Sequence, residues 1–339
     1  MGRSFSDLAW FIGARLLQLI PVLFGVILLT FLLSHVAVKN PCEAWNPHAK
    51  RNVILACQHF WGFNQPLPVQ FEKYLSLLLQ GNWGTDPSGS PVLPAILAGV
   101  PETLELVLAS LFLMIVIGIT LGVVAARYAG RWPDHLVRIF YLSGWAAPTY
   151  LAAILLSIVV APAIGFPTEN AFTYNPPPFP QPTHMSVLDA MLAGSGSGTL
   201  DALKHLALPS IALAFLNLGI ITRMTRGSML DILPLDFIKG ARMKGLSEER
   251  VLFRHALRNS LITTTTVLGF TASGLLAGTI VVEEVFAWPG IGRYSFNAIL
   301  GYNFAGTIGV VVVFAIAVVV ANLLADIAYG FLDPRVEWR

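Results

Sequence analysis

The chain has 339 residues, of which 55% are hydrophobic and only 12% are charged, and its mean hydropathy is +0.69. Soluble domains carry about 25% charged residues, so this composition excludes an ordinary soluble domain and indicates a membrane protein. The net charge is only +2 and basic and aromatic residues do not interleave, which excludes a nucleic-acid-binding protein.

Six uncharged apolar runs are long enough to cross a hydrocarbon core of about 30 Å, which takes about 20 helical residues. They lie near residues 16–38, 106–126, 139–162, 205–222, 259–282 and 305–325. The first run is too long for a signal-peptide core and has no clear small-residue cleavage site after it, so we expect a retained helix. We expect Pro21 either to kink this helix or to end an interfacial first turn. The sequence therefore predicts an all-α membrane protein with six transmembrane helices.

The basic residues indicate how the chain is oriented. If both termini are inside, fifteen of the 21 Lys and Arg lie in inner segments and six in the much longer outer segments, which is a clear positive-inside bias. We therefore expect a multi-pass protein of the cell membrane with both termini in the cytoplasm. The two long outer segments lie near 39–101 and 163–204. The second contains NPPPFPQP and GSGSG, which favour a lid, a docking surface or an exposed linker.

The stretch 236–258, DFIKGARMKGLSEERVLFRHALR, concentrates charge between the fourth and fifth runs. We expect Asp236 to cap a short helix over 237–244, because a side-chain oxygen at this position accepts from the first free N–H groups. Gly245 is suited to the left-handed conformation that ends such a helix. The pattern predicts a defined shape that is presented to a partner; the alternative is a solvated loop.

A second short helix is expected to begin after Ser247. Glu248 and Glu249 then occupy its first turn, where acids interact favourably with the helix dipole. Basic residues recur on one face of this helix at every fourth position, namely Arg250, Arg254 and Arg258.

Motifs of catalysis and metal binding are absent from the sequence. There is no GxxxxGK[ST] phosphate loop, since Gly194 to Gly198 are followed by Thr199 and Leu200, and there is no HExxH, CxxC or GxSxG. The seven His are scattered singly. We therefore expect no enzymatic activity, no metal site and no cofactor in this chain. The middles of the six runs lack Asp, Glu, Lys and Arg and no internal repeat is visible, so the energy for any transport should come from outside the chain.

Several motifs in a fixed order resemble the permease subunits of ABC importers for dipeptides, oligopeptides and nickel. ARMKGLSEERVLFRHALRNSL (241–261) is similar to the loop of that family that docks on the ATPase. Lys239, Gly240, Ala241 and Gly245 fall on its Glu-Ala-Ala-x-x-x-Gly frame, with a basic first residue as in the peptide branch. The resemblance extends through LIPVLFGVILLTFLL (19–33), ETLEL (102–106), GVVAARYAG (122–130), HLALPSIALA (205–214), RMTRGSML (223–230), VVEEVFAWPGIGRY (281–294) and NLLADIAYGFLDPRV (322–336).

The resemblance implies a type I importer fold in which this chain forms half of a translocation path. The implied partners are a second homologous permease, usually a different chain, two cytoplasmic ATPases that hold ATP and Mg, and an extracytoplasmic substrate-binding protein, all within or beside a lipid bilayer. It also implies three regions: residues 1–98 with the first helix and an outer segment, the transmembrane domain 99–333 with a coupling helix at about 236–245, and a cytoplasmic tail 334–339.

Two groups of residues take roles from this resemblance. The ATPase-docking segment comprises Asp236, Phe237, Lys239, Gly240, Ala241, Arg242, Lys244, Gly245 and Leu246. The outer gate loop comprises Glu283, Trp288, Pro289 and Gly290. The alternative for Trp288 and Pro289 is a simple interfacial anchor. Glu283 and Glu284 would either meet the binding protein or a cationic substrate, or form a solvated rim.

Further polar residues lie within or beside the predicted spans. Asn217 and Asn322 could bond across helices or line the path. Asp326 lies near the inner end of the sixth run, where pairing with an Arg or a helix end is expected. The chain departs from the family at KNPCEAWNP (39–47) and at Thr263 to Thr266, where a Pro is usual. Thr hydroxyls bond back to carbonyls one turn earlier, so we expect a gentle bend there.

Cys42 and Cys57 are the only two cysteines. Both fall in the outer segment, where an oxidising compartment lets disulfides persist, so we expect them to be bonded; the alternative is two separate small hydrophobic residues.

The function expected from the sequence is that of a permease subunit of an ATP-driven peptide importer. The same architecture serving oligosaccharides or nickel is an alternative, as is a non-transporting membrane scaffold or receptor.

Overall fold

The computed structural model describes residues 5–37, 42, 50–146, 148–174 and 177–332. These residues form helices and turns, with one isolated β-bridge between Thr85 and Pro91. The elements in chain order are α1 (Phe5–Ala37), α3 (Arg51–Trp61), α4 (Leu67–Leu79), α5 (Val92–Arg127), α6 (Trp132–Ala146), α7 (Thr149–Leu155), the π-helix η1 (Leu156–Val160), α8 (Ala161–Ile164), α9 (Ser186–Leu192), α10 (Gly196–Ile232), α11 (Asp236–Met243), α12 (Glu248–Arg250), the π-helix η2 (Val251–Ala256), α13 (Leu257–Val285), α14 (Ile291–Leu300) and α15 (Phe304–Leu332).

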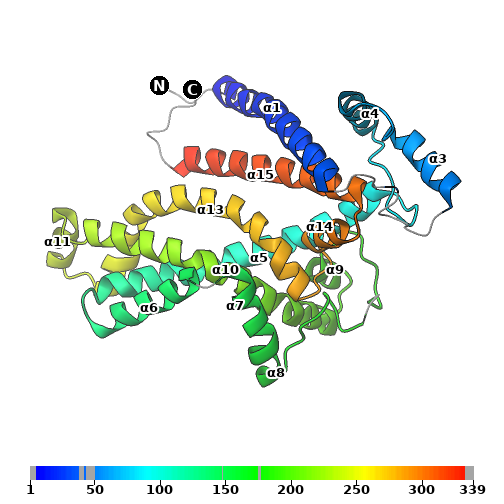
Figure 1. Ribbon diagram of the computed structural model, residues 1–339. Coiled ribbons are helices and arrows are strands. Elements are labelled where there is room, and N and C mark those ends of the chain that lie inside the picture. Colours follow the sequence, from blue (N-terminus) through cyan, green and yellow to red (C-terminus); the bar gives the residue numbers. More distant parts are fainter. Residues whose placement is uncertain (1–4, 38–41, 43–49, 147, 175–176, 333–339) are drawn as a thin grey trace.

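Most long helices run lengthwise through the molecule, several short ones lie at its two ends, and α7 and α8 project from its middle (Figure 1). Helix α11 lies at one end, while α3, α4, α9 and α14 lie toward the other; we call these the α11 end and the α14 end. Helices α1 and α15 lie side by side, and α1 begins and α15 ends toward the α11 end. The fold is therefore an all-α membrane protein with distinct structures at its two faces.

Several helices are long and apolar enough to cross a membrane. Within the described residues these are Ile12–His35, Val92–Arg127 and Phe304–Leu324, and the bent pair Gly196–Phe215 and Asn217–Ile232 makes a fourth if it is one span. The two other predicted spans correspond to the apolar stretch Tyr150–Ile164 and to α13. Each of the six predicted runs thus coincides with helical structure, although the third run is interrupted and the fourth is bent.

The third predicted span, 139–162, is not one continuous helix. Helix α6 ends at Ala146 and α7 begins at Thr149, with Pro148 as its N-cap. Pro148 has an extended backbone with ψ of 141° and no N–H to donate, so the helix does not continue through it. The prediction of an uninterrupted span was wrong at this point.

Helix α10 extends well beyond the predicted run 205–222 at both ends. Its first residues belong to the GSGSG sequence, whose composition is typical of a flexible linker. Ser195 caps the helix because its hydroxyl oxygen accepts a hydrogen bond of 3.1 Å from the Gly198 N–H. The helix bends by 56° between Phe215 and Asn217. A cap that satisfies free N–H groups thus overrides the flexibility of a Gly-Ser sequence.

Helices α5 and α10 form the most extensive helix–helix contact among the described residues. A Cβ atom at Gly122 would lie 2.6 Å from Cβ of Thr225, and one at Gly118 would lie 3.0 Å from Cβ of Ile221. Glycines spaced as Gly-x-x-x-Gly let membrane helices approach closely. Around this contact, buried apolar side chains of α5, α10 and α13, including Leu106, form the main core.

The second helix of the charged stretch is continuous with the fifth span. Residues 248–285 form α12, η2 and α13 without a break, and Ser247 occupies the N-cap position but makes no side-chain cap bond. Thr265 Oγ1 donates to the Leu261 carbonyl at 2.7 Å, as expected for a Thr in a helix. The side chains of Thr263 and Thr266 lie outside the described residues. The π-helical turn η2 was not predicted.

A buried ion pair joins the first turn of α6 to α10. Asp134 is fully buried, and its two carboxylate oxygens accept from Arg226 at 2.7 and 2.9 Å. The Gly130 N–H also donates to it at 2.9 Å, and Arg138 lies 3.5 Å away. The hydrogen bonds from Arg226 lower the pKa of Asp134 to about 2.

We expect Asp134→Asn to lower the stability of the protein by about 3 kcal/mol or more at neutral pH, because it leaves the Arg226 charge without its buried partner. The pKa of Asp134 is lowered in the folded state, so the pair stabilises fully above the ordinary Asp pKa of about 3.9 and loses its effect as the pH falls toward about 2. The measurement is the temperature at which the detergent-solubilised protein aggregates, from pH 7 to pH 3. Asp231→Asn, at an exposed acid of α10, is the control and should change little. A wild-type midpoint for Asp134→Asn at pH 7 would contradict the role of this pair.

At the α14 end, a disulfide joins Cys42 to Cys57, with their Cα atoms 6.0 Å apart. The bond borders an apolar cluster in which Ile27 and Phe31 of α1 pack against Phe304 of α15. This cluster also includes Val92 and Ile96 at the start of α5, so the predicted boundary between residues 98 and 99 falls inside a packed helix.

We expect protein purified without reductant to contain this disulfide. A bond that closes a loop of this size, with a sequence separation of 15, stabilises a fold by about 3 kcal/mol in the chain-entropy model. The double variant Cys42→Ser and Cys57→Ser should therefore aggregate at a lower temperature than wild type. Mass spectrometry of an unreduced digest checks the bond directly: the two Cys peptides should appear joined, and two free thiols would contradict the prediction.

Candidate functional site

Helix α11 projects from the α11 end and has two contrasting faces (Figure 1). Ile238 is fully buried and Ala241 nearly so, and both belong to an apolar cluster with Val251 of η2. On the outward face, Phe237 is 47% exposed and Met243 is 83% exposed. The inward face thus anchors the helix to its own chain, while the outward face leaves two large apolar side chains for a partner.

The end of α11 has the geometry that the sequence predicts. Gly245 has φ of +76°, in the left-handed region, and its N–H donates to the Arg242 carbonyl at 2.9 Å. Arg242 then reaches across the turn and forms two hydrogen bonds to Glu248, at 3.1 and 2.7 Å. These bonds lower the pKa of Glu248. Leu246 is half-buried against the same apolar cluster. The turn therefore fixes α11 relative to α12.

The start of α11 differs from the prediction by one residue. Asp236 is the first helical residue, and Leu235 occupies the N-cap position without a side-chain cap bond. The Asp236 carboxylate instead accepts from Lys239 Nζ at 2.9 Å, one turn along the helix. The prediction of Asp236 as the N-cap was wrong by one residue, since the Leu235 carbonyl accepts the first helical hydrogen bonds, from the N–H groups of Ile238 and Lys239.

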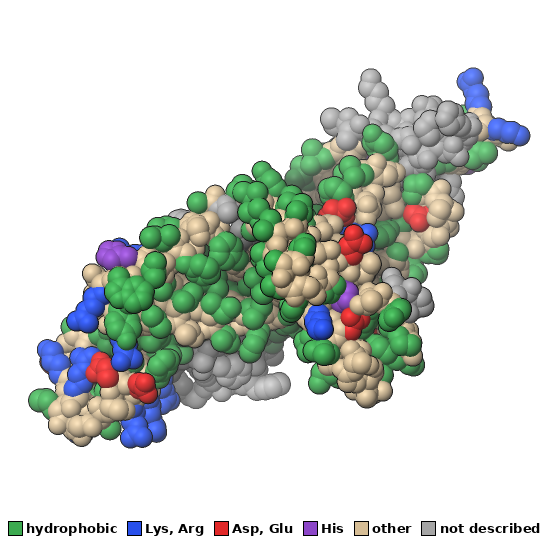
Figure 2. All heavy atoms as spheres, turned by 90° about the horizontal axis from the view of Figure 1, so that it is seen from below, with side chains coloured by type: hydrophobic (Ala, Val, Ile, Leu, Met, Phe, Trp, Pro, Cys, Tyr) green, Lys and Arg blue, Asp and Glu red, His purple; other side chains and the backbone are tan. Residues whose placement is uncertain are grey.

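The surface around α11 is basic. Figure 2 shows Lys and Arg side chains gathered at the α11 end, whereas Asp and Glu are more prominent toward the α14 end. The exposed basic residues of the docking segment and the following helix are Lys239, Arg242, Lys244, Arg250, Arg254 and Arg258.

The loop that follows α13 at the other end is packed into the core. Trp288 is 0% exposed, and its indole N–H donates to the Glu102 carbonyl at 3.0 Å. The Trp288 backbone N–H donates to the Glu283 carbonyl at 2.8 Å. The alternative of an interfacial anchor for Trp288 is therefore wrong, although Pro289 is exposed.

Glu283 connects this loop to α5. It is fully buried, and Oε1 accepts from Thr103 Oγ1 at 2.7 Å while Oε2 accepts from the Arg293 N–H at 3.0 Å. Thr103 Oγ1 in turn accepts from the Ile291 N–H at 2.8 Å. The reading of Glu283 as a solvated rim is thus wrong: its carboxylate joins α5, α13 and α14. Gly290 is buried directly against Glu283 and Thr103, leaving no room for a side chain.

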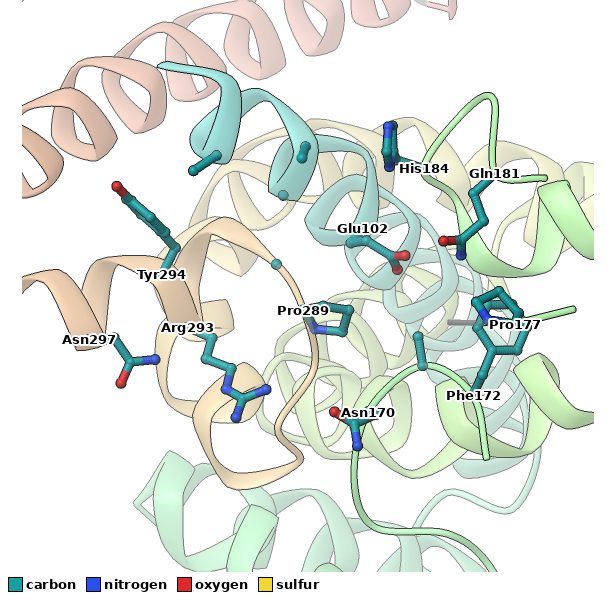
Figure 3. A pocket seen from close by; sticks show the side chains of 15 residues that line it. Glu102, Asn170, Phe172, Pro177, Gln181, His184, Pro289, Arg293, Tyr294 and Asn297 are labelled. Carbon is teal, nitrogen blue, oxygen red and sulfur yellow. The ribbon is translucent and has the colours of Figure 1, made fainter. Parts of the chain in front are cut away.

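A cavity of about 440 Å³ lies beside this loop (Figure 3). Its wall combines the outer part of α5, the loop before α9, and the segment from Pro289 to α14. The polar side chains that line it include Glu102, Asn170, Gln181, Arg293 and Asn297. Sequence reasoning missed this cavity because its walls come from segments more than 60 residues apart.

The other predicted polar residues do not join either site. Asn217 is half-buried and donates to the Leu213 carbonyl of its own helix at 3.4 Å. Asn322 is exposed on α15. The side chain of Asp326 lies outside the described residues. A role in lining the path therefore remains a prediction for Asn217 and Asn322.

The fold and sequence place this chain in a defined class. Residues 118–338 match the family of binding-protein-dependent transport system inner membrane components, and the chain belongs to that family. In fold, it is similar to a chain of the MetNI methionine ABC transporter in an inward-facing crystal form. That chain is 17% identical with a TM-score of 0.54, and the match covers 71% of this chain and 97% of the other. The protein is thus a permease with the type I ABC importer transmembrane fold.

Curated relatives match nearly the full length. The probable D,D-dipeptide transport system permease protein DdpB of Escherichia coli is 37% identical, with 94% of each chain covered. The dipeptide transport system permease protein DppB of Alkalihalophilus pseudofirmus is 34% identical, covering 96% of this chain and 98% of that protein. The oligopeptide transport system permease protein AppB of Bacillus subtilis is 33% identical, covering 98% and 100%.

Proposed function

We propose that this chain is the permease subunit of an ATP-driven importer of di- or oligopeptides and forms half of the translocation path. The observation that carries the proposal is the match to relatives named for dipeptide and oligopeptide transport along almost the whole chain. A substrate-binding protein outside the membrane delivers the peptide, and the second half of the path comes from a homologous permease.

Helix α11 is the proposed contact to the ATPases. Its exposed Phe237 and Met243 supply an apolar surface, and the turn at Gly245 holds them in place. A helix of 8 residues is marginal alone in water, so contacts on both faces stabilise it. The chain lacks a phosphate loop, so two separate ATPase subunits bind ATP and Mg and carry out hydrolysis.

The proposed orientation places the α11 end in the cytoplasm together with both termini. The basic surface at that end supports it, because cytoplasmic segments of membrane proteins are rich in Lys and Arg. A reporter domain that is active only in the cytoplasm should be active when it is fused to either terminus. Activity of a reporter that works only outside the cytoplasm would contradict this orientation.

Uptake into vesicles tests the function. The complex of this chain with its partner permease, ATPases and binding protein should transport labelled dipeptides when ATP is present on the side of the vesicle membrane that carries the ATPases. The isolated chain should hydrolyse no ATP. Matched assays with a maltooligosaccharide and with Ni²⁺ test the other substrates of this architecture. Uptake of either of these without peptide uptake would replace the peptide assignment, and a complex that transports nothing while hydrolysis proceeds would favour a non-transporting role.

A further inference from the structure

The cavity at the α14 end contains a buried carboxylate oxygen that the protein leaves without a partner. Glu102 is 6% exposed, and its Oε1 accepts from Ser186 Oγ at 2.7 Å. Its Oε2 is buried and accepts no hydrogen bond from the described residues. Figure 3 shows the carboxyl group directed into the cavity and toward Gln181. Because a buried acceptor without a donor is unfavourable, the geometry leaves a place for a donor from outside the chain.

The surroundings of Glu102 favour a cation. Glu105 lies one turn further along α5 and accepts from the Val187 N–H at 3.0 Å. Glu283 accepts a hydrogen bond from Thr103, the residue next to Glu102 in the chain. Of these three carboxyl groups only Glu102 lines the cavity, and Arg293 is the one Arg or Lys among the described residues of its wall. A charged N–H donor forms stronger hydrogen bonds to a carboxylate than a neutral one does.

The opposite side of the cavity has donors. Figure 3 shows Arg293 and Asn297 on the far side of Pro289 from Glu102. Arg293 Nη1 donates to the Ala287 carbonyl at 2.7 Å, which holds the guanidinium beside the cavity. A ligand that carries an ammonium group at one end and a carboxylate at the other matches this distribution of charge. The volume of about 440 Å³ falls in the range of about 300–1,000 Å³ that is typical of ligand pockets.

The backbone of the cavity wall is strained. Four non-glycine residues of the described chain have positive φ, and two of them, Asn170 at 63° and His184 at 54°, line the cavity. A third, Ala287 at 47°, provides the carbonyl that holds Arg293. Residues in this region of conformational space are unfavourable unless the surroundings enforce them, and they cluster at ligand-binding sites.

We propose that this cavity is an outer subsite for a short zwitterionic peptide, with the free ammonium end on Glu102 and the carboxylate end toward Arg293. The inference rests on the proposed function, since it names the place at which an imported peptide first contacts the permease after it leaves the binding protein. The subsite selects for a free amino terminus.

Direct binding tests the subsite. The assembled complex without binding protein is placed in lipid nanodiscs, and equilibrium dialysis measures its affinity for labelled Ala-Ala and for N-acetyl-Ala-Ala, which lacks the ammonium charge. We expect wild type to bind Ala-Ala about tenfold more tightly than the acetylated peptide, as for the loss of one charge-assisted hydrogen bond. Glu102→Gln should abolish this preference. Glu105→Gln, an equally conservative change at a buried acid outside the cavity wall, should retain it.

Three outcomes would overturn the subsite. They are equal affinity of wild type for the two peptides, an unchanged preference in Glu102→Gln, and an equal loss of preference in Glu105→Gln. A fourth outcome would also overturn it, because a Lys of the binding protein is another source of an ammonium group. If Glu102→Gln weakens binding of the unloaded binding protein but leaves the peptide preference intact, the cavity binds that Lys and the peptide subsite is wrong. Wild-type uptake of peptides in vesicles distinguishes failure of the subsite from failure of the proposed function.

Discussion

Replacing Gly245 by Val should separate the ATPases from an otherwise normal permease. At φ of +76° the Cβ of an L-residue strains the backbone by about 1–2 kcal/mol, and a β-branched residue is the least tolerated. No other atom lies within 4 Å of the added Cβ, so the cost comes from the turn itself and not from a clash. The turn then opens, α11 tilts, and Phe237 and Met243 no longer face the partner together.

The expected result is at least a tenfold loss of peptide uptake with normal insertion in the membrane, because about 1.4 kcal/mol at the interface corresponds to a factor of ten in affinity. Co-purification of the ATPases and uptake into vesicles provide the measurements. Gly165→Val is the matched control, since Gly165 also has positive φ, at 68°, with open space around it, but lies away from α11. Wild-type uptake by Gly245→Val would show that the segment does not transmit the motion of the ATPases.

Ala241→Asp provides a second test at the same helix. Ala241 is only 7% exposed and packs in the apolar cluster with Val251. An aspartate there places an unpaired charge in an apolar contact, which is strongly unfavourable. Helix α11 should therefore lose its packing against η2. This variant should therefore lose the ATPases at least as completely as Gly245→Val.

A second large effect is expected from Gly290→Ala in the outer gate loop. A Cβ at this position would collide with Glu283 and Thr103. Neither neighbour can yield easily, because both are buried and hydrogen-bonded to each other. Overpacking of this kind costs about 1–3 kcal/mol, and each buried hydrogen bond that breaks adds a similar amount. The loop should therefore leave its packed position.

Loss of this packed arrangement should uncouple the importer. In the assembled complex we expect Gly290→Ala to hydrolyse ATP without the loaded binding protein, so that stimulation by that protein falls several-fold. Gly274→Ala, on the exposed side of α13 with no atom within 4 Å of the added Cβ, should behave as wild type. If Gly290→Ala retains full dependence on the binding protein, the packed loop is not a gate.

The sequence predicted features that depend on local chemistry. The left-handed turn at Gly245 follows from the special conformational freedom of glycine, and α11 follows from a few neighbouring residues, so both were predicted to within one residue. Each of the six apolar runs falls on helical structure in the described residues, because hydropathy along the chain reflects the solvent of each segment.

Features that depend on distant partners could not be predicted. Glu283 and Thr103 are 180 residues apart, and Asp134 and Arg226 are 92 apart. Nothing near any of these residues indicates that it is buried, since burial depends on which helices pack together. The same is true of Trp288, whose partner is a backbone carbonyl of α5. For Glu283 and Trp288 the sequence therefore left a surface position open as an alternative, since acids are mostly exposed and Trp is rarely fully buried.

Helix α5 is one continuous helix that extends from one end of the molecule to the other. From Glu102 to Ala126 it rises by about 36 Å at 1.5 Å per residue. Its outer half contacts Trp288, Glu283 and the cavity, and its inner half shares an apolar cluster with Ile238 of α11. If this segment tilts by about 10° about its midpoint as a rigid rod, its two ends move by about 3 Å in opposite directions. A displacement of α11 would thus move the loop between α13 and α14 without any series of side-chain rearrangements between them.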